Sequence, residues 1–251
     1  MIGLKGKRAL VTGGSRGIGA ATAQLFAENG VHVAIGYRNR RADAEELVAS
    51  LREHGVTASA HASDISTLRG AEELIDRSTE SLGGLDFFVG NAGIWPTADV
   101  SFASMSDEQW RRTIAENVDS VFFTTRAAIR AMSDHGRIVL VSSTAGQRGE
   151  AYHADYGASK GAVISLVKSL APELARRDIT VNSVAPGWVD TEMCDEPFAG
   201  GGRERIAAGI PLGRIASPRD IAGPIVFLCS DLARHITGEI VNVNGGSVLC
   251  G

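Results

Sequence analysis

The sequence predicts a doubly wound α/β fold, a parallel β-sheet with helices on both faces, formed as a single domain over residues 1–251. Two observations predict it. Short, β-branched apolar stretches alternate with longer amphipathic stretches along the whole chain, and a glycine-rich turn joins the first strand-like stretch to the first helix-like one. Strands that alternate with helices favour right-handed crossovers, and these produce a parallel sheet.

We expect about seven strands, a number within the range of doubly wound sheets. Their positions are residues 8–13, 32–37, 57–62, 86–91, 136–143, 179–187 and 239–246. The helices expected between them cover residues 18–29, 41–54, 67–82, 107–132, 154–176 and 219–229. Because ligands of such a sheet bind outside the carboxyl ends of the strands, functional residues are expected there.

Residues 190–211 interrupt this alternation of strands and helices. The length of the segment and its glycines, Gly200, Gly201 and Gly202, predict a mobile lid over a substrate. A disordered surface insertion is the alternative.

The composition favours a globular protein that acts on small molecules. Of the 251 residues, 44% are hydrophobic and 22% charged, which suits one domain with a large core. The net charge of -4 provides no broad basic surface for nucleic acid. No signal peptide and no stretch near the roughly 18 apolar residues of a membrane span is present, so we expect a cytoplasmic protein. The widely spaced Cys194, Cys229 and Cys250 indicate neither a disulfide framework nor a metal site.

The glycine-rich turn is a candidate phosphate site. Gly13, Gly14, Gly17 and Gly19 lie between a strand and a helix, where free N–H groups and the helix dipole favour a pyrophosphate. The spacing is neither G-x-G-x-x-G nor a P-loop. A plain tight turn is the alternative.

The end of the second strand favours NADP over NAD as the dinucleotide. An acidic residue usually stands there to bind the ribose hydroxyls of NAD. Here the strand ends in Gly36, Tyr37 and Arg38 instead. Arg16 and Arg38 could converge on a 2'-phosphate as bidentate donors, so we expect NADP(H), with NAD(H) possible. Two solvated surface arginines are the alternative.

Tyr156 and Lys160 lie one helical turn apart and form a candidate catalytic pair. A nearby ammonium favours phenolate, which would lower a tyrosine pKa from near 10, so that Tyr156 could act as general acid toward a ketone or as general base toward an alcohol. Ser143 ends a strand and could hydrogen-bond the same substrate oxygen. Asn117, inside a predicted helix, could bond backbone or a water relay. Simple packing, a turn serine and a solvent-facing asparagine are the respective alternatives.

With Thr-Gly-Gly-Ser-Arg-Gly-Ile-Gly at 12–19, Asn-Ala-Gly at 91–93, Ser143, Tyr156-x-x-x-Lys160 and Pro-Gly at 186–187 in this order, the chain resembles the short-chain dehydrogenase/reductase family over essentially its whole length. It is most similar to the branch of 3-oxoacyl-[acyl-carrier-protein] reductases. The resemblance implies that Tyr156 transfers the proton, Lys160 tunes it and binds the nicotinamide ribose, Ser143 anchors the substrate oxygen and Asn117 serves a water relay.

The resemblance also implies the positions that bind the cofactor and the substrate. The cofactor residues are Gly13, Ser15, Arg16, Gly17, Ile18, Gly19, Tyr37, Arg38, Asp64, Ile65, Asn91, Ala92, Gly93, Tyr156, Lys160, Pro186, Gly187, Val189 and Thr191. The substrate residues are Trp95, Gln147, Tyr152, Trp188, Met193 and Phe198.

The expected reaction is hydride transfer between the nicotinamide and a carbonyl or secondary alcohol. A 3-oxoacyl thioester or similar small ketone is the first expectation, a sugar or polyol dehydrogenase the second, and a non-catalytic dinucleotide sensor a remote third. An acyl carrier protein is a doubtful partner, because Met132–His135 lacks the basic residues usual in that branch, although Arg176 and Arg177 supply part of a basic patch. Apolar positions on the two long helices, Phe122, Phe123, Val163 and Leu166, together with the resemblance, indicate a homo-oligomer, with a tetramer favoured.

Overall fold

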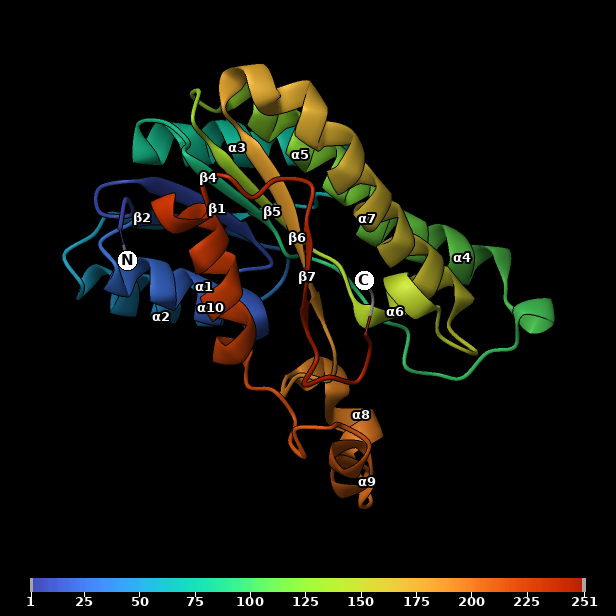
Figure 1. Ribbon diagram of the computed structural model, residues 1–251. Helices are drawn as coiled ribbons and strands as arrows, with labels where there is room; N and C mark the ends of the chain where they lie inside the picture. Colours follow the sequence, from blue (N-terminus) through green and yellow to red (C-terminus); the bar gives the residue numbers. More distant parts are fainter. Residues whose placement is uncertain (1, 250–251) are drawn as a thin grey trace.

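Seven strands form one parallel sheet in the computed structural model, which describes residues 2–249 (Figure 1). The strand order is β3-β2-β1-β4-β5-β6-β7, so the direction of winding reverses between β1 and β4. Such a reversal opens a crevice at the carboxyl ends of the strands. The predicted parallel sheet is confirmed, with strands β1 (Arg8–Thr12), β2 (His32–Tyr37), β3 (Ala58–Ala62), β4 (Phe87–Gly90), β5 (Arg137–Val141), β6 (Thr180–Pro186) and β7 (Ile240–Val243).

Helices cover both faces of the sheet (Figure 1). One layer holds α1 (Gly17–Glu28), α2 (Arg41–Arg52) and α10 (Pro218–Cys229), and the other holds α3 (Leu68–Leu82), α5 (Ser120–Ala131) and α7 (Ala154–Leu174). α7 ends in a 3-10 turn at Ala175–Arg177. Each of these helices lies at a position predicted from the sequence.

The prediction of one continuous helix over residues 107–132 is wrong. The segment is divided into α4 (Asp107–Ile114), a π-helical turn (Ala115–Asp119) and α5. A short 3-10 turn, Phe102–Ser104, precedes α4. Wide π turns inside α-helices often mark functional sites, and this one holds Asn117.

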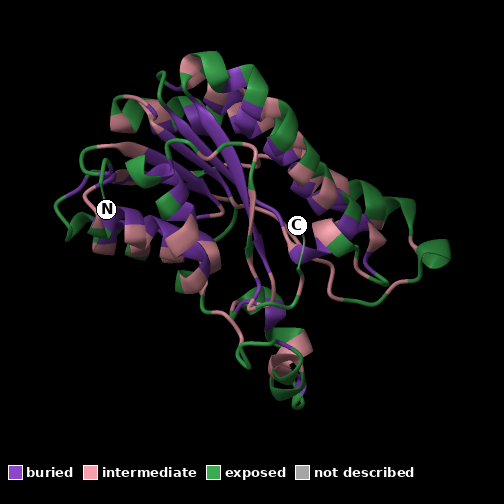
Figure 2. Ribbon diagram, in the orientation of Figure 1, coloured by how far each residue is buried: buried purple, intermediate pink, exposed green. Residues whose placement is uncertain are grey.

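Alternate residues of the central strands enter two separate cores. Val11 and Val139 pack in the layer of α1, α2 and α10, whereas Leu10 and Ile138 pack in the layer of α3, α5 and α7. All five residues of β5 are buried, as the continuous apolar stretch predicted. Figure 2 shows the central strands buried beneath helices whose outer faces are exposed, so the sheet is a rigid platform for the loops at its carboxyl edge.

The predicted lid segment is folded into short helices, so the disordered alternative is wrong. A 3-10 turn at Glu192–Cys194 leads into α8 (Asp195–Phe198) and then α9 (Gly202–Ala208), which project beyond the carboxyl ends of the strands (Figure 1). Gly201 precedes α9 at a φ of +80°, and a Cβ at Gly202 would lie 2.0 Å from the Pro197 carbonyl oxygen. The glycines therefore serve a tight helix-to-helix turn. Movement of this lid stays a prediction.

Val163 does not lie on the exposed surface that the sequence indicated. It is 2% exposed, because its side of α7 packs in the core with β6. Phe122 on α5 is 44% exposed, as expected.

The remaining sequence predictions concern thiols, metals and membranes. Cys194 and Cys229 are buried free thiols, and Cys250 lies outside the described residues. Over residues 2–249 no group of three or more His, Cys, Asp or Glu side chains could hold a metal ion. No helix in that range is long and apolar enough to cross a membrane.

Candidate active site

A cavity of about 1150 Å³ opens at the carboxyl ends of the strands, between the sheet and the lid segment. It exceeds the roughly 300–1,000 Å³ of a typical ligand pocket, which suits a dinucleotide together with a substrate. All the predicted cofactor residues except Gly19 line it. Gly19 lies beneath: a Cβ there would be 2.2 Å from the Gly13 carbonyl oxygen, so only glycine allows α1 to pack this close to β1.

The glycine turn has the geometry of an anion site. Gly13 and Gly17 adopt φ values of +62° and +54°, which L side chains rarely adopt. α1 begins after Arg16 with no side-chain cap and no acidic residue in its first turn. The first N–H groups of a helix have no partner within it, so this end is open to a phosphate oxygen. The residues present thus fit the pyrophosphate of a dinucleotide.

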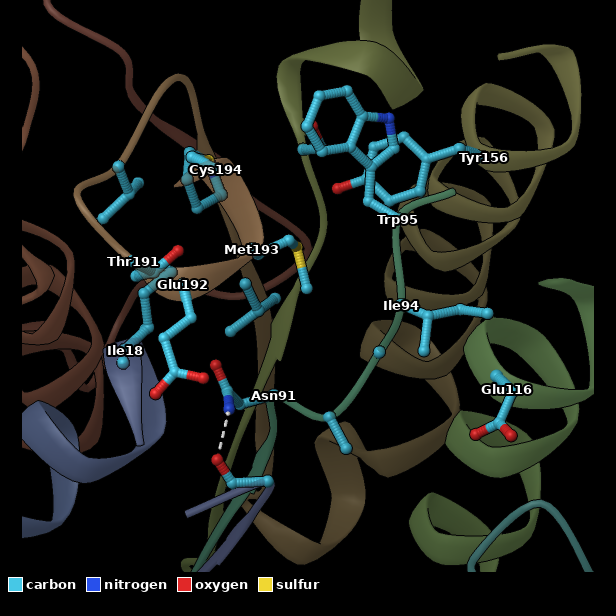
Figure 3. Close-up of a pocket in the computed structure, with 18 of the residues that line it drawn as sticks. Ile18, Asn91, Ile94, Trp95, Glu116, Tyr156, Thr191, Glu192, Met193 and Cys194 are labelled. Atoms are coloured by element: carbon cyan, nitrogen blue, oxygen red, sulfur yellow. Dashed lines mark hydrogen bonds between the residues drawn. The ribbon is translucent and has the colours of Figure 1, made fainter. Parts of the chain in front are cut away.

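Asn91 fastens the loop after β4 to this turn. Its Nδ2 donates to the carbonyl oxygens of Thr12 and Gly13 at 3.0 and 3.2 Å (Figure 3). The Thr12 hydroxyl accepts from the N–H groups of Asn91 and Ala92 at 3.0 and 3.1 Å. The predicted ribose-binding loop and the predicted phosphate turn are therefore held together as one wall of the cavity.

The arginines at the cavity mouth pair with carboxylates from other segments of the chain. Arg16 pairs with Glu192 of the lid segment, and so does Arg40, whose Nη2 lies 2.8 Å from the same carboxylate oxygen. Arg38 instead pairs with Glu116 and with Asp64 at 2.9 Å. Arg16 and Arg40 thus share one carboxylate, whereas Arg38 binds two others. That Arg16 and Arg38 converge on a 2'-phosphate stays a prediction. Neither predicted arginine is simply solvated.

Ser143 and Tyr156 meet at the carboxyl end of β5. Ser143 caps a short helix absent from the prediction, α6 (Thr144–Arg148), and accepts from the N–H of Ala145 at 3.1 Å. Tyr156 stands in the first turn of α7, and its phenol hydrogen-bonds the Ser143 side chain. α6 and α7 pack closely here, since a Cβ at Gly146 would lie 2.5 Å from the backbone carbon of Lys160. The predicted pairing of these two hydroxyls on one substrate oxygen is geometrically feasible.

The pKa of Tyr156 is shifted in the direction opposite to that expected. Burial raises it to about 12, with nearby Cys194 and Glu150 adding to the rise, whereas the hydrogen bond with Ser143 opposes it. Burial lowers the pKa of Lys160 to about 8. The Lys160 ammonium does not offset the effect on the phenol, because its Nζ donates to the Val141 carbonyl oxygen at 3.1 Å and lies 5.8 Å from the Tyr156 ring centre. In this structure the phenol is held protonated at neutral pH.

Asn117 is fully buried, so a solvent-facing role is wrong. Its Oδ1 accepts from the Ile94 N–H at 2.7 Å, and its Nδ2 donates to the Ile94 carbonyl at 2.9 Å and to Ser159 Oγ at 3.0 Å. Ser159 in turn donates to the Tyr156 carbonyl at 2.7 Å. The π turn therefore joins the loop after β4 to the catalytic helix, and the backbone-bonding role expected of Asn117 is the one observed.

Two tryptophans form the wall of the substrate end. The rings of Trp95 and Trp188 meet edge to face at 5.6 Å, and Trp95 lies 6.3 Å from the Tyr156 ring (Figure 3). Met193 of the lid segment also lines the cavity. These three predicted substrate residues line one cavity, and Trp95 lies beside the phenol.

The other three predicted substrate residues do not line the cavity. Gln147 Nε2 is turned to Asn242 Oδ1 at 2.7 Å, beside β7. Tyr152 adopts a φ of +66° in a turn that leaves it 59% exposed. The Phe198 ring is tilted against that of Trp188 at 5.9 Å, and the Arg203 guanidinium lies over the Phe198 ring. Each lies near a site residue in sequence, but local backbone direction points it elsewhere.

His153 and Glu192 are cavity residues that sequence reasoning missed, along with Arg40. His153 is 5% exposed, its Nε2 lies 3.2 Å from Asp99, and its ring lies 5.3 Å from Trp95. Its position three residues before Tyr156, on the same side of the chain, was a usable signal. Glu192 carried no such signal, because a charged residue in a lid is ordinarily solvated.

Comparison with known proteins gives consistent results. The family model described as enoyl-(acyl carrier protein) reductase matches residues 13–247. The chain is 40% identical over 249 residues to the 3-oxoacyl-[acyl-carrier-protein] reductase FabG of Vibrio cholerae, covering 97% of this chain and 98% of that protein. It is 39% identical over 247 residues to the L-rhamnose 1-dehydrogenase (NAD(P)(+)) of Azotobacter vinelandii, covering 96% of each.

A solved short-chain dehydrogenase from Burkholderia cenocepacia, in complex with NADP, is 36% identical and superposes with a TM-score of 0.91 over 97% of this chain and 98% of that one. The fold, the site and these relatives define an oxidoreductase that acts between carbonyl and alcohol groups. The chain belongs to the short-chain dehydrogenase/reductase family.

Proposed function

We propose that this protein is an NADP(H)-dependent reductase of small ketones, with 3-oxoacyl thioesters as the favoured substrate class. The observation that carries the proposal is that Ser143, Tyr156 and Lys160 line the same cavity as the glycine turn that precedes the open N-terminus of α1. Three arginines at the mouth, Arg16, Arg38 and Arg40, support a phosphorylated dinucleotide.

The chain's own residues supply the proton chemistry. A bound nicotinamide dinucleotide would provide the hydride. Tyr156 donates its proton to the carbonyl oxygen, and the Ser143 hydroxyl donates a hydrogen bond to the same oxygen as negative charge develops there. Trp95 and Trp188 exclude water from that oxygen. Lys160, buried beside Gly93, lies where it could hold the ribose next to the nicotinamide.

The relatives support this choice without deciding the substrate. Several proteins about as similar as the Vibrio cholerae enzyme are also 3-oxoacyl-[acyl-carrier-protein] reductases, including that of Escherichia coli at 39% identity. An acyl carrier protein is a less favoured partner than a free thioester. Arg177, half of the basic patch expected to meet it, is engaged by Asp134 and by the carbonyl oxygens of Ile129 and Met132.

Oxidation of a sugar or polyol is the second candidate. The paired tryptophans beside Tyr156 could stack on the apolar face of a sugar ring, and the Azotobacter vinelandii relative is a sugar dehydrogenase by name. A catalytically silent dinucleotide sensor is a remote alternative. Turnover by the wild type that is lost in the Tyr156→Phe variant would exclude it.

A substrate panel separates these functions. Initial rates would be measured with NADPH and acetoacetyl thioesters, and with NADP and NAD against L-rhamnose and simple polyols. We expect thioester reduction with NADPH to be fastest. Strong polyol oxidation without thioester reduction would overturn the first proposal in favour of the second.

We also propose a cytoplasmic homotetramer. The exposed Phe122, with the Arg126 guanidinium 4.6 Å above its ring, offers an apolar face on α5 for a second copy. Light scattering on the purified protein tests the assembly, and a monomer at micromolar concentration would refute it.

A further inference from the structure

The carboxylate of Glu192, in the lid segment, occupies a position for which a cofactor phosphate would compete. Its carboxylate pairs with Arg16, from the glycine turn, and with Arg40, which precedes α2. All three side chains line the same cavity, and Figure 3 shows Glu192 beside Ile18 of α1. One carboxylate oxygen thus bridges two guanidiniums that come from different parts of the chain.

The lid is seated on the glycine turn at this point. Thr191, the residue before Glu192, lies so close to Gly17 that a Cβ there would be 3.2 Å from the Thr191 methyl group. Arg16 immediately precedes α1, and Arg40 follows the end of β2 at Tyr37, the strand end beside which a dinucleotide places its adenosine ribose. A 2'-phosphate on that ribose would lie within reach of both arginines.

The ion pairs of Glu192 with Arg16 and Arg40 position these side chains but are weak enough for a competing anion to displace them. The side chains of Arg16, Arg40 and Glu192 are each about half exposed, at 51%, 50% and 49%. Exposed ion pairs contribute only about 0–1 kcal/mol, whereas a phosphate dianion offers bidentate bonds to both guanidiniums. Displacing the Glu192 carboxylate by a 2'-phosphate would therefore require a small but non-zero free energy.

We propose that Glu192 is a specificity-determining residue that competes with the 2'-phosphate of the dinucleotide for Arg16 and Arg40. The inference rests on the proposed use of NADP(H). Glu192 then weakens binding of the phosphorylated dinucleotide and leaves binding of the unphosphorylated one largely unchanged, so it restrains the preference for NADP over NAD.

The test is calorimetric titration of the full-length protein and of Glu192→Gln with NADP, NAD, adenosine 2',5'-bisphosphate and adenosine 5'-monophosphate. Gln keeps the size of the side chain and removes its charge. We expect the Kd values for NADP and for the bisphosphate to fall roughly 3- to 10-fold in the variant, with those for NAD and the monophosphate changing less than about 2-fold, as expected for the loss of two weak competing ion pairs.

Glu204→Gln is the matched control, since Glu204 carries the same charge on α9 of the same segment and pairs with neither arginine in the described chain. Its Kd values should equal those of the wild type. Arg40→Ala should weaken NADP and bisphosphate binding without affecting NAD. Thermal melts of every variant verify that it is folded.

Two results would overturn the inference. If Glu192→Gln weakens the binding of NADP and of NAD equally, Glu192 only holds the lid segment in place. If the Kd values do not change, Glu192 has no role in dinucleotide binding. Failure of the proposed function looks different: the wild type itself would show no preference for NADP and no binding of the bisphosphate.

Discussion

The two ends of the cavity are built in contrasting ways. At the catalytic end, Asn117, Ser159 and Lys160 are buried and bond mainly to backbone atoms, such as those of Ile94 and Val141. At the phosphate end, Arg16, Arg38 and Arg40 are half exposed and bond to carboxylates on other segments.

The contrast follows from what each end must do. Proton transfer needs a fixed geometry, and buried hydrogen bonds to backbone provide it, because each group left unpaired would cost about 1–3 kcal/mol. Recognition of an exchangeable anion needs cations that are preformed but releasable, and exposed ion pairs meet that need at about 0–1 kcal/mol each. Substitutions at the two ends should therefore produce different kinds of effect.

The largest effect is expected at the catalytic end, for Tyr156→Phe. Loss of the general acid should lower kcat roughly 10²- to 10⁴-fold, with little change in dinucleotide affinity. Steady-state kinetics with the best substrate of the panel, together with dinucleotide titration, measure both. Tyr152→Phe, outside the cavity, is the control and should retain wild-type rates. Equal loss in the two variants would disprove the assigned role.

Arg38→Ala tests the phosphate end. Arg38 is one of three arginines at the cavity mouth. If it also contacts the dinucleotide, its removal should raise the Kd for NADPH about 10- to 100-fold, since charge-assisted hydrogen bonds contribute about 1.5–3 kcal/mol. The wild-type Kd should also rise with added salt, whereas kcat should not. Fluorescence titration of NADPH measures the affinity. Arg41→Ala, an exposed arginine paired with Glu45 on α2, should behave as wild type. A Kd for NADPH that changes neither in Arg38→Ala nor with added salt would contradict the proposed difference between the two ends of the cavity.

Asn117→Ala should reduce stability as well as activity. The variant leaves the Ile94 N–H and carbonyl without their side-chain partner, and we expect a loss of about 2 kcal/mol. In a domain of this size that lowers Tm by roughly 4–8 °C, which circular dichroism would detect. The exposed Asn39 supplies the control, since Asn39→Ala should cost less than about 0.5 kcal/mol. An unaltered Tm in Asn117→Ala would show that the buried network does not stabilise the fold.

A further effect concerns the pH dependence of stability through Lys160. Its pKa is lowered to about 8 from a model-peptide value of 10.5, so the unfolded chain binds more protons between those pH values. The contribution of Lys160 to stability therefore rises with pH across this window and is lost as pH falls through 8.

Lys160→Met removes this dependence. Relative to the variant, the wild type should gain up to about 1.4 kcal/mol per pH unit between pH 8 and 10. Urea unfolding at several pH values measures the difference. Parallel curves for the two proteins would mean that the amine is not desolvated. Tyr156, with its pKa raised to about 12, stabilises below pH 10 and loses that contribution only above it, so it does not interfere in this window.

Local patterns in the sequence predicted the sheet, the glycine turn and the candidate catalytic positions, because strand and helix periodicity and short motifs depend on neighbouring residues. Ser143 and Tyr156 were predictable because one ends a strand and the other begins the helix that follows. The π turn at Asn117 and the helix α6 were not, because their stabilising contacts come from segments far away in sequence.

Only the tertiary structure decided how the charges at the cavity mouth are paired and which way the pocket side chains point. Arg16 meets Arg40 and Glu192, separated by up to 176 residues, and no local pattern encodes such a contact. Gln147 and Tyr152 lie outside the pocket. Gln147 hydrogen-bonds Asn242 on a distant strand, and Tyr152 stands in a turn with a positive φ. The pKa of Tyr156 likewise depends on desolvation of its phenol in the folded chain, which the spacing of Tyr156 and Lys160 alone could not predict.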